Sequence, residues 1–139
     1  MFIKCIFYIA CNLFTDKDMS PMVGMGAGDA SFPKITQDGR DGDEEPGYIA
    51  NFRDGVTAGF KYLSFKGVKK VSIITRGYGN GTFEFTTEIG GKPVASVKVS
   101  NTNFWEVDSS EASFPDGTFP VYVTYRGDNA PSFLGFILE

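Results

Sequence analysis

Residues 55–91 read GVTAGFKYLSFKGVKKVSIITRGYGNGTFEFTTEIGG, and this stretch decides the fold class. The segments VSI (71–73) and FEF (83–85) alternate apolar and polar side chains. Such a period of two is typical of antiparallel strands that bury one face and leave the other in water. Glycines at 67, 77, 79, 81, 90 and 91 interrupt the apolar runs at the spacing of strand-connecting turns.

The same pattern extends over the whole range 48–138. Strands are predicted at residues 48–52, 57–65, 69–76, 81–89, 93–100, 103–108, 119–126 and 132–138. No window of ten or more residues sustains a helical period. The sequence therefore predicts an all-β fold, and two facing antiparallel sheets fit the spacing better than a closed barrel.

Length and charge narrow the class of protein. A chain of 139 residues fits one domain that can bury roughly two-thirds of its unfolded surface. The net charge of −4 argues against a nucleic-acid partner, because phosphate binding requires a cationic surface. The chain has no histidine, which excludes catalytic triads and imidazole bases.

The first fourteen residues are largely apolar and contain both cysteines, Cys5 and Cys11. Because the β-rich part has no cysteine, a disulfide scaffold is excluded. The segment is shorter than the ~20 residues that span a bilayer and is interrupted by Lys4 and Asn12, so no membrane span is expected. Two alternatives fit this segment. It is either the apolar part of a secretory signal, or residues 3–14 form a strand that remains from a larger parent protein.

Residues 19–45 are dense in glycine, proline and aspartate and show no periodicity, so they read as linker and loop. We place a boundary between an N-terminal segment with linker, residues 1–34, and a folded sandwich, residues 35–139. The acidic cluster between Asp38 and Glu45 offers oxygen ligands for calcium, although Arg40 and Gly42 do not fit an EF-hand loop. A solvated linker is the alternative.

Trp105 is the only tryptophan and follows a polar turn, residues 100–103. An indole at a strand mouth can present a flat face to a ligand, and burying about half of its ~200 Å² is worth about 2.5 kcal/mol. The alternative is that Trp105 closes the end of the core. Tyr48, Phe52 and Tyr78 also lie near turns and are further candidate platforms.

Polar partners for such a platform are available in the neighbouring turns. The candidates are Asn101, Asn103, Asn129 and Arg76. Amides and guanidinium groups pair with hydroxyls that both donate and accept. The alternative for each asparagine is a local role in a turn. Flat apolar faces beside such groups suit a polyhydroxylated ring, which favours a sugar-binding module.

The stretch YIANFRDGVTAGFKYLSFKGVKKVSIITRGYGNGTFEF (48–85), the tryptophan strand and VYVTYRGDNAPSFLGFILE (121–139) resemble the family-6 carbohydrate-binding modules. The likeness covers residues 35–139 and is greatest to the modules fused behind family-43 glycoside hydrolases, which are xylosidases and arabinofuranosidases. LFTDKDMSPMV (13–23) also looks like the end of a family-43 catalytic domain. The resemblance implies a jelly-roll β-sandwich that binds xylan-type or related β-glycans without cleaving them.

In that family a sugar lies between two aromatic rings and is oriented by an asparagine near the last strand. Tyr48 and Trp105 stand at the positions that resemble the rings. Ser132 stands where the asparagine is expected, with Asn129 three residues earlier. The family's structural calcium implies a site near the first strand, where this chain has Gln37 and Asp38.

Three functions follow as hypotheses. The first is a secreted or cell-surface binding module that tethers a catalytic glycoside hydrolase domain to plant cell-wall polysaccharide. The second is an accessory domain that packs on a family-43-type catalytic domain and binds no sugar. The third, a small hydrolase, requires two acids across a cleft. Its candidates, Glu84, Glu88, Glu106 and Asp108, alternate with core residues and are expected to point toward solvent.

Overall fold

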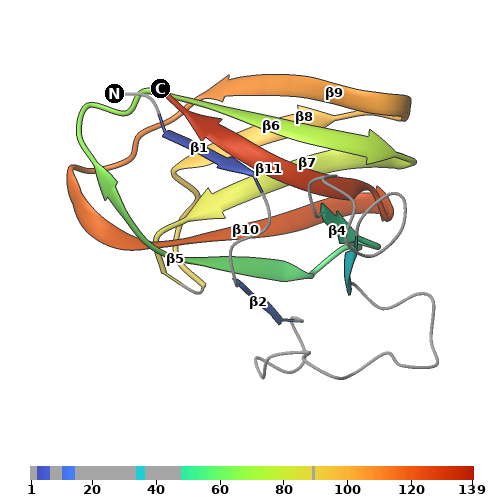
Figure 1. The fold of residues 1–139 in the computed structure, drawn as a ribbon, viewed down its shortest axis with the longest axis horizontal. Helices are drawn as coiled ribbons and strands as arrows, with labels where there is room; N and C mark the ends of the chain where they lie inside the picture. The colour runs from blue at the N-terminus through green and yellow to red at the C-terminus, as the bar shows by residue number, and fades with distance from the viewer. Residues whose placement is uncertain (1–2, 7–10, 15–33, 37–47, 89) are drawn as a thin grey trace.

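The computed structural model describes residues 3–6, 11–14, 34–36, 48–88 and 90–139 (Figure 1). The strands are β1 (Ile3–Ile6), β2 (Cys11–Phe14), β3 (Lys34–Thr36), β4 (Tyr48–Ala50), β5 (Thr57–Phe65), β6 (Lys70–Gly77), β7 (Gly79–Thr86), β8 (Ala95–Val99), β9 (Thr102–Glu111), β10 (Gly117–Asn129) and β11 (Ser132–Leu138). Across these residues all regular structure is strand, which confirms the all-β prediction. That part of the chain accordingly contains no helix able to cross a membrane.

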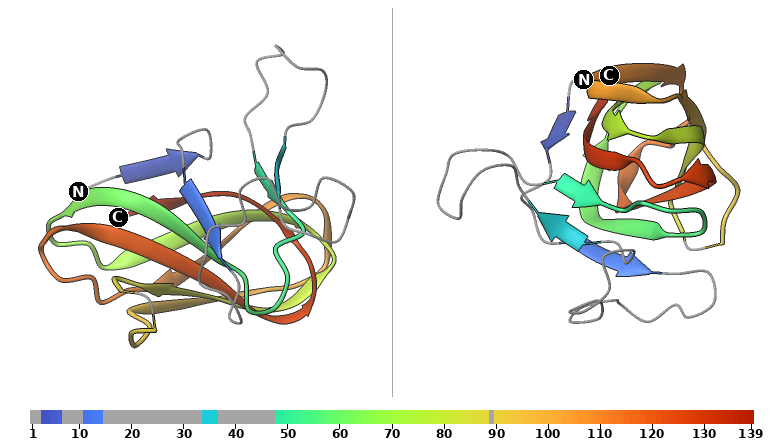
Figure 2. Two further views of the ribbon diagram at one scale, coloured as in Figure 1. Left: turned by 90° about the horizontal axis from the view of Figure 1, so that it is seen from below. Right: turned by 90° about the vertical axis from the view of Figure 1, so that its right-hand side faces the viewer.

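The strands form two antiparallel sheets that face each other (Figure 2). One sheet has six strands, in the order β3-β4-β11-β6-β9 with β1 also paired to β11. The other has five strands, in the order β2-β5-β10-β7-β8. Strands that are neighbours in a sheet are mostly distant in sequence, because the chain crosses repeatedly from one sheet to the other. The prediction of a two-sheet sandwich is confirmed.

The N-terminal segment contributes a strand to each sheet. Strand β1 pairs with β11, with Ile3 opposite Leu138, and β2 pairs with β5, with Cys11 opposite Phe60. Two strands, β1 and β2, thus lie within residues 3–14. For this range the sequence left two alternatives, a strand or part of a secretory signal. The domain boundary at residue 35 stays a prediction.

Phenylalanine rings fill the space between the sheets. Phe133 of β11 is fully buried, and its ring centroid lies 5.2 Å from that of Phe83 and 5.7 Å from that of Phe52. Next to Phe133, the rings of Phe60 and Phe136 meet edge to face at 4.9 Å. Such pairs add to the stability that their buried area already provides.

Phe52 was predicted as a surface platform, and this prediction was wrong because Phe52 is fully buried. The reason is Asn51, whose backbone is left-handed with φ 58° and turns the chain after β4. The N–H of Phe52 then donates to the carbonyl of Pro131 at 3.1 Å. The ring is held in the core by this change of direction, which alternation alone does not reveal.

Candidate functional site

Three predicted site or partner residues meet on the six-stranded sheet: Tyr48 of β4, Arg76 of β6 and Trp105 of β9. Their neighbours Ile49 and Thr75 are buried. Because successive side chains of a strand point to opposite faces, Tyr48 and Arg76 lie on the outer face of the sheet. We call Tyr48, Arg76 and Trp105 the ring cluster.

A bulge in β9 brings Trp105 to this place. Thr75 is opposite Glu106 and Gly77 is opposite Thr102, so Arg76 alone faces the three residues from 103 to 105. Extra residues in one strand of a pair bend that strand and redirect its side chains. Trp105 is consequently half-buried at the sheet surface and is not part of the buried core.

The ring cluster is a compact group of two rings and one cation. The centroids of Tyr48 and Trp105 are 5.2 Å apart, with the ring planes at 70°. The Cζ atom of Arg76 lies 4.3 Å from the Trp105 centroid and 5.3 Å from the Tyr48 centroid. Cation–π contacts of this kind contribute about 0.5–2 kcal/mol each, depending on how far they are removed from water. All three side chains are half-buried.

The other predicted sugar-binding residues are Ser132, Asn103 and Asn129, and they do not all lie beside the ring cluster. Ser132 is opposite Arg76 in the ladder between β11 and β6, so it borders the ring cluster. Asn103 is exposed in the β9 bulge that faces Arg76. Asn129 belongs to the five-stranded sheet, where it pairs with Gly79 and has a left-handed backbone with φ 59°. Asn129 is therefore the last residue of β10 and lies in the other sheet from Tyr48, Arg76 and Trp105.

Asn101 has a local role. Its Oδ1 accepts a hydrogen bond of 2.8 Å from the N–H of Gly79, which joins the β8–β9 turn to the start of β7. This contact agrees with the turn alternative for Asn101. Next to it, Tyr78 and Phe104 expose 67% and 69% of their surfaces, so aromatic surface continues beyond the ring cluster at this end of the sheet.

From the sequence, Arg76 was expected only as a hydrogen-bond partner, and its contact with both rings was not predicted. The available signal was limited to the position of Arg76 at the end of a predicted strand. Finding the contact requires knowing that β6 lies next to β9 and that β11 separates it from β4.

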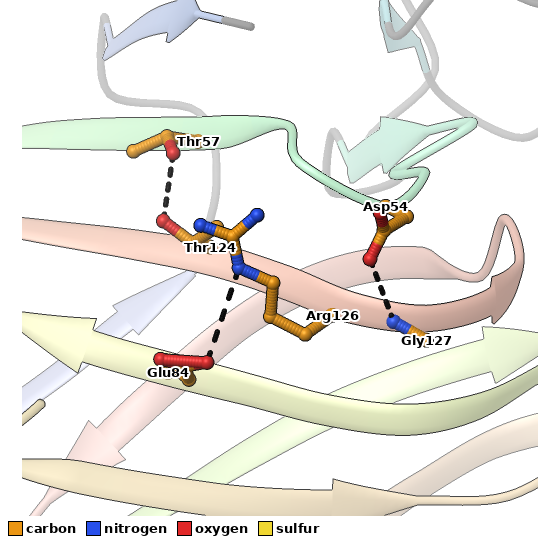
Figure 3. Close-up of polar contacts among 6 residues, drawn as sticks. All are labelled: Asp54, Thr57, Glu84, Thr124, Arg126 and Gly127. Atoms are coloured by element: carbon orange, nitrogen blue, oxygen red, sulfur yellow. Dashed lines mark hydrogen bonds and ion pairs between the residues drawn. The ribbon is translucent and has the colours of Figure 1, made fainter. Parts of the chain in front are cut away.

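The outer face of the five-stranded sheet carries pairs of polar side chains (Figure 3). The hydroxyls of Thr57 and Thr124 are 2.7 Å apart, and Arg126 Nε lies 4.0 Å from Glu84 Oε1. Glu84 thus belongs to a different sheet from Glu106 and Asp108, which are both on β9. The arrangement does not bring Glu84 together with those two acids, as the hydrolase alternative would require.

Asp108 has a raised pKa, first because burial disfavours its charge and second because Glu106 is a neighbouring negative charge. An acid whose pKa is higher in the folded state than in the unfolded state destabilises the fold as pH rises through that window. We therefore expect Asp108→Asn to raise the melting temperature at pH 7. The gain should shrink as the pH falls through the raised pKa of Asp108, because the wild-type carboxyl then takes up a proton. Melting curves of both proteins across pH 3.5–7 check this, and an equal gain at every pH would contradict it.

The predicted calcium ligands Gln37 and Asp38 lie outside the described residues. Among the residues that are described, no group of three or more His, Cys, Asp and Glu side chains is placed to hold a metal ion. The calcium site therefore stays a prediction.

The sandwich with its surface ring cluster has the fold of the family-6 carbohydrate-binding modules, which confirms the resemblance at the level of the fold. One such module from Clostridium stercorarium, solved with cellobiose, matches all of this chain and 92% of its own at TM-score 0.70 and 13% identity. A β-1,3-glucan-binding module from Bacillus halodurans matches all of this chain and 95% of its own at TM-score 0.69 and 18% identity. The chain thus shares the β-sandwich fold of these modules.

A relative found by sequence similarity is a protein much longer than this chain. A xylosidase/arabinosidase of Thermoclostridium stercorarium is 48% identical over 132 residues, which are 94% of this chain. The chain spans only 28% of the length of that relative. No family model matches the chain.

Proposed function

We propose that this chain is a non-catalytic carbohydrate-binding domain whose ring cluster is the sugar-binding site. The observation that carries the proposal is the surface position of Tyr48 and Trp105, half-buried and in contact on one sheet face. Aromatic faces are the usual platforms for the apolar CH faces of sugar rings, and nearby polar groups orient the hydroxyls. The Ser132 hydroxyl and the Asn103 amide supply such groups here.

We infer that the ligand is a xylan-type polysaccharide such as arabinoxylan. The support is the 48% identity to a part of a xylosidase/arabinosidase. A structural neighbour of this chain is a family-43 arabinoxylan arabinofuranohydrolase of Bacillus subtilis, solved with cellotetraose, although it matches only 65% of this chain at 17% identity and TM-score 0.60. The competing ligand is a β-glucan, because other neighbours were solved with cellobiose or are named as β-1,3-glucan-binding.

The proposed role is to hold a catalytic glycoside hydrolase domain close to plant cell-wall polysaccharide outside the cell. Tethering raises the effective substrate concentration without any new contact at the catalytic site. The relative supports this partner, since the matched part is 28% of an enzyme.

Affinity electrophoresis tests the proposal. The chain is run in native gels that contain xylan, arabinoxylan, β-glucan or no polysaccharide, beside a protein that binds none of them. Retardation should be strongest with xylan or arabinoxylan. Retardation by β-glucan alone would leave sugar binding intact and overturn the xylan assignment.

The alternative is an accessory domain that packs on a catalytic domain and binds no sugar itself. Ser132 favours it, because this residue stands where the resemblance implies an amide. The edge-to-face contact of Tyr48 and Trp105 also favours it, since 5.2 Å leaves no room for a sugar between the rings. Absence of retardation by every polysaccharide would move the assignment to this alternative.

We also propose a structural calcium ion bound near Gln37 and Asp38. Calcium that binds only the folded state stabilises it by mass action. Calcium chloride should therefore raise the melting temperature of the wild type relative to EDTA, and Asp38→Asn should reduce the difference. An identical melting temperature in calcium and in EDTA would contradict the site.

A further inference from the structure

The guanidinium of Arg76 lies over the two aromatic rings on which a sugar would stack in the proposed site. Its Cζ atom lies over both rings, 4.3 Å from the Trp105 centroid and 5.3 Å from the Tyr48 centroid. The two rings stand at 70° with centroids 5.2 Å apart, in edge-to-face contact. The guanidinium therefore lies against one face of each ring.

Packing distances indicate that a sugar ring and the guanidinium of Arg76 cannot occupy the same aromatic face at the same time. A sugar ring that stacks on an aromatic face lies at van der Waals contact, about 3.5–4.0 Å away. The guanidinium of Arg76 already occupies this layer over Trp105, at 4.3 Å. A sugar between two rings would need a separation of about twice the contact distance, roughly 7–8 Å, and the rings are 5.2 Å apart.

The backbone explains why Arg76 reaches the two rings. Arg76 is the single β6 residue that faces three residues of the β9 bulge, and Ser132 borders it on the other side. A planar guanidinium stacks well on aromatic faces, and its long flexible stem allows it to move to another position on the surface. The contact is therefore stabilising and can be displaced.

We propose that Arg76 is an internal competitor for the ring cluster and sets which sugar chains bind. A ligand reaches the faces of Trp105 and Tyr48 that lie under the guanidinium only when it displaces this group, so ligands that stack weakly on those faces are rejected. This inference rests on the proposed function, because it requires that the ring cluster binds sugar. Removing a residue that contacts the sugar weakens binding. Removing Arg76, by contrast, should strengthen binding.

The test compares Arg76→Ala, Arg76→Lys and the wild type by calorimetric titration with xylohexaose, cellohexaose and laminarihexaose. Arg76→Ala should bind about 2- to 30-fold more tightly, which is the range of a lost cation–π contact expressed as affinity. Arg76→Lys keeps the charge but not the planar group, so its affinity should fall between the two. Arg126→Ala removes the same charge from the other sheet and should stay within about twofold of the wild type.

A second readout needs no ligand. Trp105 is the only tryptophan, so acrylamide quenching of the fluorescence reports on its indole alone. Quenching should increase in Arg76→Ala and remain unchanged in Arg126→Ala. Unchanged quenching in Arg76→Ala would mean that the guanidinium does not cover the indole, and it would overturn the inference.

The outcomes separate the inference from the proposed function. If the wild type binds and Arg76→Ala binds equally or more weakly, Arg76 is not a competitor and the proposed function stands. If neither protein binds any of the three hexasaccharides, both the inference and the assignment of the ring cluster as a sugar site fail. Tighter binding by Arg76→Ala, with increased quenching, supports both.

Discussion

Replacing Phe133 by alanine is expected to lower the free energy of unfolding by about 3–5 kcal/mol. Phe133 is fully buried and contacts the rings of Phe52, Phe60 and Phe83 at centroid distances of 5.7, 6.4 and 5.2 Å. Its removal leaves a cavity at the centre of the core. Domains of this size are stable by about 5–15 kcal/mol, so the loss is a large part of the total.

Urea unfolding of Phe133→Ala and of Phe104→Ala measures this effect with a matched control. Phe104 is 69% exposed, so its truncation should change the stability by no more than about 0.5 kcal/mol. Phe133 is also paired with Ile49 of β4, the strand that carries Tyr48. A destabilisation below about 1 kcal/mol for Phe133→Ala would contradict the described core.

The second large effect is expected for Trp105→Ala, which should weaken sugar binding by roughly 70-fold. This factor corresponds to about 2.5 kcal/mol for the apolar area that an indole face buries against a sugar. Calorimetric titration with the oligosaccharide of the polysaccharide that retards the wild type measures it.

Tyr62→Ala is the matched control for Trp105→Ala. Tyr62 is a 70% exposed aromatic on β5 of the other sheet, so its removal should change the affinity by less than about twofold. Circular dichroism checks that both variants are folded. Loss of binding in Tyr62→Ala with retention in Trp105→Ala would place the site on the five-stranded sheet.

Alternation of apolar and polar residues was sufficient to predict the class of fold and the strands from β4 to β11, each to within three residues of its bounds. The predicted bounds 57–65 and 132–138 coincide with β5 (Thr57–Phe65) and β11 (Ser132–Leu138). The glycines at 77, 79 and 81 were read as turn positions and the predicted strand 119–126 ended before residue 127, yet Gly79 to Gly81 pair with Gly127 to Asn129 in the ladder. Glycine permits this pairing because a Cβ at Gly81 would lie 2.4 Å from the carbonyl oxygen of Arg126.

The composition of the ring cluster was only partly predictable. The resemblance selected Tyr48 and Trp105 as a pair, and the structure places them in contact. The position of Arg76 over both rings depends on the order of strands in the sheet and on the β9 bulge. Neither follows from local periodicity, because each is determined by pairing between residues far apart in the sequence.

The measurement that tests sugar binding at the ring cluster most directly is an NMR titration of the ¹⁵N-labelled chain with xylohexaose. The single tryptophan gives one indole N–H resonance, which belongs to Trp105. We predict that this resonance shifts and saturates with the same dissociation constant that calorimetry gives. Calorimetric binding of xylohexaose without any change in the Trp105 resonance would contradict the account.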